Sequence, residues 1–472
     1  MKREDFDVVV IGAGVAGVCC AAELVLQGLR PLLIAESKEV GVAVRAKFVG
    51  ENFGVMQAVS WSSGWGGGGW PHLVRKLNVP VSIPDGFHPM NTHAVFNGDR
   101  KVHRLEQSAL SGSSFAAVLT GLFPQMSSVA GEIDMLYQKA LEMPIQDLMK
   151  MHDVPFADWI EDQKVDELTA HVFSIVGAFC AATCLTPGPS ADWIRANMST
   201  YGLLGALRTV FSDALFCQIA PDNRRGLLIP LVRAVERHGG TVWRGSRVAR
   251  VETDGGRVGT VVLEDGREAK APLIAIATGN ARFAGILDAL PPELEAPLAF
   301  AEQFKPRDFS FFAVLDRPVL PREFDRWITR FGAEGNLESW IAPYNALTPW
   351  AVEQGKQFVG QFAVIPEPDL PKHGSEQDIY DKMNDALEFY APGYKDAIVD
   401  FGTDSHPASH LWFDHVWAGP KVPRSVESVS GLFFVGSSSW PTGGLWFDGA
   451  ATNGILGARE MATVLPGMRT RR

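Results

Sequence analysis

The sequence predicts an α/β fold in which one parallel sheet is assembled from separated parts of the chain and interleaved with an α+β domain. Three observations support this expectation. Residues 5–37 read as strand, glycine turn, helix and strand, residues 241–277 hold short β-type runs, and residues 431–436 form another apolar run before a stretch of small residues. The intervening residues 109–215 have apolar positions spaced by three and four, which is typical of helices.

The first unit is a strand that breaks into a glycine-rich turn. The apolar run at residues 7–11 leads into a Gly-x-Gly-x-x-Gly pattern formed by Gly12, Gly14 and Gly17, with Ala16 inside it. Gly12 allows a sharp turn, Gly14 lets the backbone approach a pyrophosphate, and Gly17 lets the helix pack closely on the strand. The start of that helix presents free N–H groups and the positive end of its dipole to phosphates.

A second apolar run, residues 31–35, ends in an acid. Glu36 lies 24 residues after Gly12 (36 − 12). An acid at this point hydrogen-bonds the ribose hydroxyls of an adenine dinucleotide and disfavours a 2′-phosphate, which argues against NADP. Together, the strand, glycines, helix, strand and acid predict a Rossmann-like dinucleotide-binding unit.

The remaining segments continue the pattern. A helix that ends in glycine is expected at 226–240. Turns of the hairpin type stand at Asp254-Gly255-Gly256 and Asp265-Gly266. Strands are expected at 241–243, 247–253, 258–263 and 272–277, further β-type runs within 300–365, and a helix at 376–390.

Composition narrows the class of protein. With 472 residues, 46% of them hydrophobic and 21% charged, the chain is long enough for two or more globular domains. The 13 Trp and 28 Phe predict an aromatic cavity or interface. A net charge of −11 argues against nucleic acid as a partner. The sequence does not determine the oligomeric state.

The cysteines and the chain start point to the cytosol. The five cysteines are odd in number and lie in apolar runs, so we expect reduced core residues and no metal site: Cys19, Cys20, Cys180, Cys184 and Cys217. The first five residues leave no room for a signal peptide. The uncharged run at 172–185 is too short to span a bilayer, which leaves a buried helix or a peripheral membrane contact.

Three blocks carry a family resemblance. They are the Gly12 to Glu36 unit, the block from Gly239-Gly240-Thr241 through Arg247-Val248 to Asp265-Gly266, and the tail from Gly436 to Gly454. They resemble the phytoene desaturase and flavin amine oxidase superfamily, and the tail is more similar to the desaturase branch. The resemblance covers about residues 5–45, 225–285 and 430–465, and no motif marks the segments between them.

The resemblance implies FAD as the cofactor. It places the FAD-binding domain in residues 1–85, 220–285 and 425–472, and a substrate domain in 86–219 and 286–424. In this superfamily the backbone at Val248 would hold the adenine, and the amides near Gly449 and Ala450 would face the flavin. The implied cofactor-binding residues are Gly12, Gly14, Ala16, Gly17, Glu36, Arg45, Val248, Gly279, Gly436, Ser437, Gly449 and Ala450.

The sequence departs from the superfamily pattern in three ways. Arg45 follows Gly41-Val42-Ala43-Val44, where the family has Gly-Gly-Arg, and is the candidate arginine for the pyrophosphate. Ser437 replaces the usual acid of the tail. No tyrosine pair of the amine oxidases is recognisable among the six Tyr, which makes amine oxidation less favoured.

Candidate catalytic and substrate residues cluster near the tail. Trp440, Trp446 and Phe447 are expected to form walls of an apolar cavity, with ordinary packing as the alternative. Asp448 is either a base beside the flavin or an N-cap of the following helix. His410 lies among His406 and His415 and is either a proton acceptor or part of a surface loop.

Three functions fit these features. The first, which we favour, is an FAD-dependent dehydrogenase, desaturase or oxidase that removes hydride from a C–H bond of an apolar substrate, with isoprenoid and alicyclic molecules as candidates. The second is an FAD-dependent isomerase without net redox change. The third is a nucleotide-bound escort protein without turnover.

Overall fold

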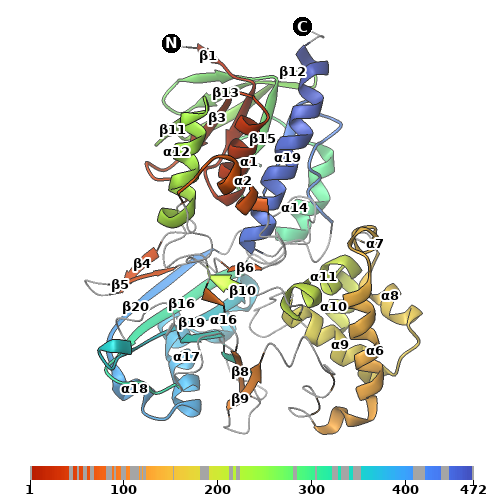
Figure 1. The fold of residues 1–472 in the computed structure, drawn as a ribbon, viewed down its shortest axis with the longest axis vertical. Coiled ribbons are helices and arrows are strands. Elements are labelled where there is room, and N and C mark those ends of the chain that lie inside the picture. Colours follow the sequence, from red (N-terminus) through yellow and green to blue (C-terminus); the bar gives the residue numbers. More distant parts are fainter. Residues whose placement is uncertain are drawn as a thin grey trace.

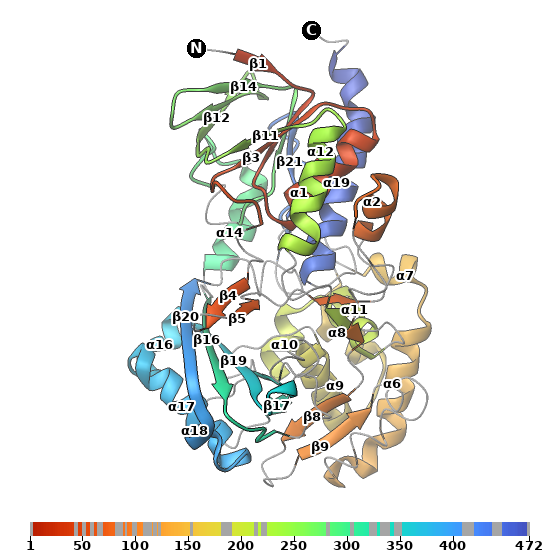
Figure 2. The same ribbon diagram turned by 60° about the vertical axis from the view of Figure 1, so that its left-hand side comes forward.

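The computed structural model describes residues 3–41, 46–49, 53–56, 61–63, 69–80, 88–89, 92–96, 102–106, 116, 120, 124–151, 154–180, 191–211, 216–218, 224–279, 284–302, 306–320, 328–330, 340–343, 352–407, 420–436 and 446–469. In Figure 1 the two chain ends lie together in an upper part built around a parallel sheet. A larger, mostly antiparallel sheet and a cluster of helices form the lower part (Figures 1 and 2).

The parallel sheet joins the separated segments that the sequence indicated. Its order is β11-β3-β2-β15-β21, and every neighbouring pair is parallel. This arrangement confirms the α/β, Rossmann-like fold class. The strands are β2 (Val8–Ile11), β3 (Pro31–Ala35), β11 (Thr241–Arg244), β15 (Leu273–Ile276) and β21 (Leu432–Phe434).

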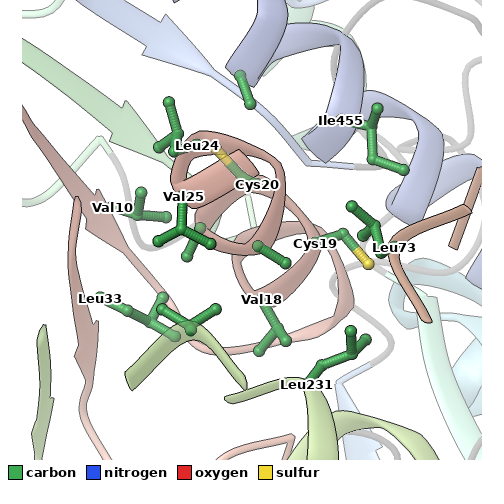
Figure 3. Close-up of a cluster of buried hydrophobic side chains, with 14 of the residues drawn as sticks. Val10, Val18, Cys19, Cys20, Leu24, Val25, Leu33, Leu73, Leu231 and Ile455 are labelled. Atoms are coloured by element: carbon green, nitrogen blue, oxygen red, sulfur yellow. The ribbon is translucent and has the colours of Figure 1, made fainter. Parts of the chain in front are cut away.

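Alternate side chains of this sheet enter two cores. Val8 and Val10 of β2 pack in the core under the helices α1 (Val15–Leu26), α12 (Ile229–Arg237) and α19 (Trp446–Arg469). Val9 and Ile11 pack on the other face, against a second sheet. Such alternation is what a strand buried on both faces requires. In Figure 3, Val10 and Leu33 lie on the sheet side of α1, with Leu231 and Ile455 on the neighbouring helices.

The second sheet has the order β1-β14-β13-β12. Gly255 (φ 56°) and Gly256 (φ 76°) form the two-residue turn between β12 and β13, with Asp254 paired to Arg257. Positive φ at both central positions defines the type I′ hairpin that the sequence predicted. The strands are β1 (Arg3–Asp5), β12 (Val248–Asp254), β13 (Arg257–Leu263) and β14 (Glu268–Lys270).

Cys19 and Cys20 lie fully buried in α1 as free thiols, as expected of core residues. Burial raises the pKa of the Cys20 thiol, and the neighbouring Cys19 and Glu23 raise it further. A thiol held in its neutral form is a poor nucleophile and a poor metal ligand. Cys20 is therefore a packing residue.

The lower part contains a seven-stranded sheet of order β20-β16-β19-β18-β17-β8-β9. Phe309 and Phe311 of β16 pack with Tyr380 and Met383 of α17 (Glu376–Tyr390), whereas Phe312 faces the opposite side with Phe358. The strands are β8 (Thr92–Phe96), β9 (Val102–Glu106), β16 (Pro306–Leu315), β17 (Ile328–Arg330), β18 (Trp340–Pro343), β19 (Gln357–Pro366) and β20 (Ile398–Pro407).

Helices dominate residues 124–211, as the spacing of apolar residues predicted. They are η3 (Pro124–Val129), α6 (Ala130–Glu142), α7 (Ile145–Met149), α8 (Phe156–Asp162), α9 (Glu167–Cys180), α10 (Ala191–Asn197) and α11 (Thr200–Phe211). In the part of the chain that is described, none of the helices has the length and apolar character needed to cross a membrane.

Short elements complete the fold. The small sheets are β4 (Ala46–Val49) with β5 (Phe53–Met56), and β6 (Trp61–Ser63) with β10 (Phe216–Gln218) and β7 (His88–Pro89). The remaining helical elements are α2 (Trp70–Lys76), η4 (Arg224–Leu228), η5 (Pro292–Leu294), α14 (Glu295–Glu302), η7 (Glu367–Asp369), α16 (Leu370–His373) and α18 (Tyr394–Ala397).

Candidate functional site

The candidate site lies at the carboxyl edge of the parallel sheet. The chain leaves this edge at Gly12 after β2, at Glu36 after β3, at Ala277 after β15 and at Val435 after β21. Hydrogen bonds join the ends of neighbouring strands at this edge: Gly12 N–H donates to Ile34 O at 2.9 Å, and Val435 N–H donates to Ile276 O at 2.9 Å. Ligands of open α/β sheets bind at this edge, where the strand order reverses.

Two glycines of the turn are required by the protein itself. Gly12 has φ 109°, and a Cβ there would lie 2.9 Å from Ala277 O. A Cβ on Gly17 would lie 1.8 Å from Gly12 O. Both contacts are with backbone atoms, which cannot move aside as a flexible side chain can. These positions therefore confirm the turn and the close helix–strand packing expected of them.

Gly14 differs from both. It is the N-cap of α1 with φ −79° and ψ −170°, an extended conformation that any residue adopts. A Cβ at Gly14 would meet no atom of the described residues within 4 Å. Within that part of the chain, neither backbone strain nor packing explains a glycine here. The space that a side chain would fill lies directly before the free N–H groups of α1, which fits a pyrophosphate.

Glu36 lies beside the loop that leads into β12. Ser246 N–H donates to Ala35 O at 2.9 Å and Gly245 N–H donates to Ser37 O at 2.9 Å, so residues 245–248 run alongside the end of β3. The half-exposed Glu36 carboxylate lies 3.5 Å from Arg247 Nε. Val248 follows as the first residue of β12. The structure thus brings together Glu36, the acid expected to bind the ribose, and the segment expected to hold an adenine.

Exchange of Glu36 for Gln is expected to weaken binding of an adenine dinucleotide about tenfold, because a charged acceptor of hydrogen bonds contributes about 1.5–3 kcal/mol. Titration of the purified protein with FAD, followed by flavin fluorescence, measures the change. Glu264→Gln is the matched control, since Glu264 also lies 3.5 Å from Arg247 Nε but does not follow β3. Equal losses in the two variants would refute the assignment of Glu36.

Thr278 is a further candidate for the site, beyond the residues predicted from the sequence. Its Oγ1 is buried and has no hydrogen-bond partner within the described part of the chain. Its Cγ2 lies 3.0 Å from the position of a Cβ on Gly12, so the side chain borders the glycine turn. Buried hydroxyls are nearly always hydrogen-bonded, which makes Thr278 a candidate contact for a ligand next to the predicted Gly279. Its position directly after the apolar run of β15 was the available signal.

Helix α19 runs parallel to α1. A Cβ on Gly454 would lie 2.2 Å from Ala16 O, and further along Arg459 Nε donates to Glu23 Oε1 at 2.8 Å. Helix α19 begins eight residues before Gly454, whereas α1 begins one residue before Ala16. At 1.5 Å per residue, the start of α19 lies about 10 Å further along the shared direction. Both helix N-termini therefore open toward the same edge, one beyond the other (Figure 1).

The start of α19 corrects one expectation. Asp448 is the third residue of this helix, so it lies inside the first turn and not at an N-cap before it. Gly449 is buried and Ala450 is half-buried, and both lie in the same first turns. Gly436 follows β21 at the sheet edge, as predicted.

Several predicted residues stay untested. Arg45, His410, Ser437 and Trp440 lie outside the described residues. For Trp446, Phe447 and Asp448 the structure describes the backbone as the start of α19 but not the side chains. Their roles as pyrophosphate ligand, proton acceptor, ring contact or cavity wall remain predictions.

Comparison with known proteins addresses the fold. No protein-family model and no curated protein matches the sequence. An oxidoreductase from Methanosarcina mazei has a TM-score of 0.70 at 16% identity, with 96% of this chain and 100% of that chain covered. Putrescine oxidase bound to putrescine gives 0.64 at 14% identity, with 98% and 100% covered. Cyclohexylamine oxidase from Brevibacterium oxydans IH-35A gives 0.62 at 16% identity, with 98% and 100% covered.

The chain shares the fold of these oxidoreductases. The alignments span nearly the whole of both chains, so the likeness includes the lower part, where the sequence offered no motif. The resemblance stated from the sequence is thereby confirmed at the level of the fold.

Proposed function

We propose that the protein is an FAD-dependent oxidoreductase that removes hydride from a C–H bond of an apolar substrate. The observation that carries the proposal is the pair of parallel helices α1 and α19. Their N-termini lie at the same sheet edge, about 10 Å apart along the shared helix direction. The first follows a glycine, Gly14, that the packing of the described residues does not require. The second follows the tail that resembles the flavin-binding tail of the superfamily.

Each residue of the edge has a role in this proposal. The N–H groups that follow Gly14 bind the pyrophosphate, Glu36 accepts hydrogen bonds from the ribose, and the Val248 backbone contacts the adenine. The first turn of α19, with Gly449 and Ala450, faces the ring with the positive end of its dipole. Bound FAD supplies a two-electron acceptor for hydride. The chain positions the substrate carbon and excludes water from it.

The aromatic rings on the face of the large sheet opposite α17 support an apolar substrate. Phe312 stacks with Phe358 at 6.5 Å between ring centroids and meets Phe362 edge-on at 5.5 Å. These rings point away from α17, which covers the opposite face. Isoprenoid and alicyclic molecules are the candidate substrates. Amine oxidation is the second candidate reaction, because two solved structures with this fold are named putrescine oxidase and cyclohexylamine oxidase.

The first test is the absorbance spectrum of the purified protein, before and after incubation with FAD. We expect a bound flavin, released as FAD on denaturation, that is bleached by photoreduction. Rapid recovery in air-saturated buffer would identify an oxidase, and slow recovery a dehydrogenase, desaturase or isomerase. A protein that binds no flavin under either condition would refute the proposal and favour an escort protein.

Asp448 is assigned a structural role in this proposal, because a carboxylate in the first turn stabilises a helix through the dipole. Asp448→Asn is expected to lower the Tm of the apoprotein slightly, consistent with about 0.3–1 kcal/mol, and to leave flavin bleaching by an active substrate unchanged. Thermal unfolding and stopped-flow absorbance measure the two effects. Asp378→Asn is the matched control, since Asp378 is also the third residue of its helix. A bleaching rate about a hundredfold lower in Asp448→Asn alone would make Asp448 the base.

A further inference from the structure

Glu23 is a buried carboxylate in the middle of α1. Its side chain is only 1% exposed. Because glutamate is almost never buried without a partner, the groups around this carboxylate are informative. Oε1 accepts hydrogen bonds from Arg459 Nε of α19 at 2.8 Å and from Gln27 Nε2, one turn along α1, at 2.9 Å. Oε2 is buried without a hydrogen-bond partner among the described residues, and Nε2 of His72 in α2 lies 4.0 Å away. Residues of three helices thus surround one buried carboxylate.

This ion pair joins the two helices that form the candidate site. Glu23 lies two turns into α1, and Arg459 lies near the middle of α19. The pair is charge-assisted, and its carboxylate is shielded from water, so its geometry is narrowly defined. Arg459 approaches from the surface, with 49% of its side chain exposed. A shift of either helix along its axis would leave the buried carboxylate without its cation.

Glycine packing holds the same register nearer the site. A Cβ on Gly454 would collide with Ala16 O at 2.2 Å, and a Cβ on Gly457 would lie 2.3 Å from Val435 Cγ1. Because Gly454 and Gly457 have no side chains, α19 packs closely against α1 at the first position and against the end of β21 at the second. Moving α19 by one residue, about 1.5 Å, would bring a bulkier residue to each contact.

We infer that Glu23 and Arg459 are positioning residues, which fix how far the start of α19 stands beyond the start of α1. The inference rests on the proposed function, in which the first helix N-terminus binds the pyrophosphate and the second faces the ring. The ion pair lies outside both contact regions. It acts by keeping the two ends of the dinucleotide site at one fixed separation.

The test compares two ligands. ADP contains the adenosine and pyrophosphate alone, so it reports on the α1 end, whereas FAD also needs the start of α19. Arg459→Gln is expected to raise the Kd of FAD about tenfold, equivalent to about 1.4 kcal/mol, and to change the Kd of ADP less than about twofold. Fluorescence titration measures FAD, and calorimetry measures ADP. The absorbance maxima of the bound flavin should shift in the same variant.

Conservative and double variants separate positioning from general stability. Arg459→Lys keeps the cation and is expected to restore FAD affinity to within about threefold of wild type. Glu23→Gln should reproduce Arg459→Gln, and the double variant should be no weaker than either, since the two residues act as one pair. Leu231→Ala is the matched control: Leu231 is fully buried in the same core but belongs to α12 (Figure 3). It should lower the Tm and leave the ratio of the two Kd values unchanged.

Two results would overturn the inference. Equal losses of FAD and ADP affinity in Arg459→Gln would show that the pair only supports folding, and unchanged affinity for both would show that it sets no register. A wild-type protein that binds ADP but not FAD would refute the proposed function itself. The two failures are therefore distinguishable in one series of titrations.

Discussion

Replacement of Gly14 by Asp is expected to abolish FAD binding while leaving the apoprotein as stable as wild type. Gly14 already has the extended backbone of an N-cap, and no atom of the described part of the chain lies within 4 Å of the Cβ position. Aspartate is a preferred N-cap, so α1 should gain a few tenths of a kcal/mol. The same carboxylate would occupy the approach of the pyrophosphate, repel its charge and accept hydrogen bonds from the amides that would bind it.

Two measurements on one preparation check this result. Thermal unfolding of the apoprotein should give a Tm equal to or above that of wild type, and titration with FAD should give no saturable binding. Gly131→Asp is the matched control, because Gly131 lies near the start of α6 and also has no described atom within 4 Å of its Cβ position. Retained FAD affinity in Gly14→Asp would remove the pyrophosphate site from α1.

Local signals account for the parts of the fold that the sequence predicted well. The helix expected at 376–390 has the bounds of α17, because Ser375 and Asp378 form a capping box at its start. The strands of the parallel sheet are short apolar runs, and the turn at Gly255 and Gly256 has the conformation that its composition predicted. In each case the residues that determine the element lie within it or beside it.

Long-range contacts account for what the sequence did not reveal. In the large sheet, Ile328 of β17 pairs in parallel with Ala94 of β8, 234 residues earlier (328 − 94). No local sequence pattern predicts a pairing between strands so far apart in the chain. Thr278 becomes a candidate contact for a ligand only because the turn at Gly12 packs against it. The same holds for Glu23, whose partner Arg459 lies 436 residues away.

One of the two alternatives for Asp448, an N-cap, is wrong for a related reason. Asp448 before small residues has the appearance of an N-cap, yet the helix begins at Trp446. Large aromatic residues are weak helix formers, so propensity alone favours the later start. The structure sets α19 beside β6, and tertiary contact of this kind extends helices beyond their local signals.

Replacement of Gly17 by Ala is expected to have the opposite effect to that of Gly14→Asp. One added methyl group would lie 1.8 Å from Gly12 O, with Ala277 Cβ at 3.2 Å on the other side. Helix α1 would have to move away from β2 and β15, which breaks the packing of the whole upper core. We expect a loss of about 3 kcal/mol or more in the free energy of unfolding, and a Tm lower by about 10 °C.

Thermal unfolding without ligand measures this loss, and Gly259→Ala supplies the matched control. Gly259 lies in β13, and none of the residues that the structure describes comes within 4 Å of its Cβ position, so alanine there should be neutral or slightly stabilising. A Gly17→Ala protein with a wild-type Tm would contradict the close packing of α1 on the turn. These two expected results would separate two reasons for glycine in one motif: Gly17 would be required by the fold, and Gly14, as proposed, by the ligand alone.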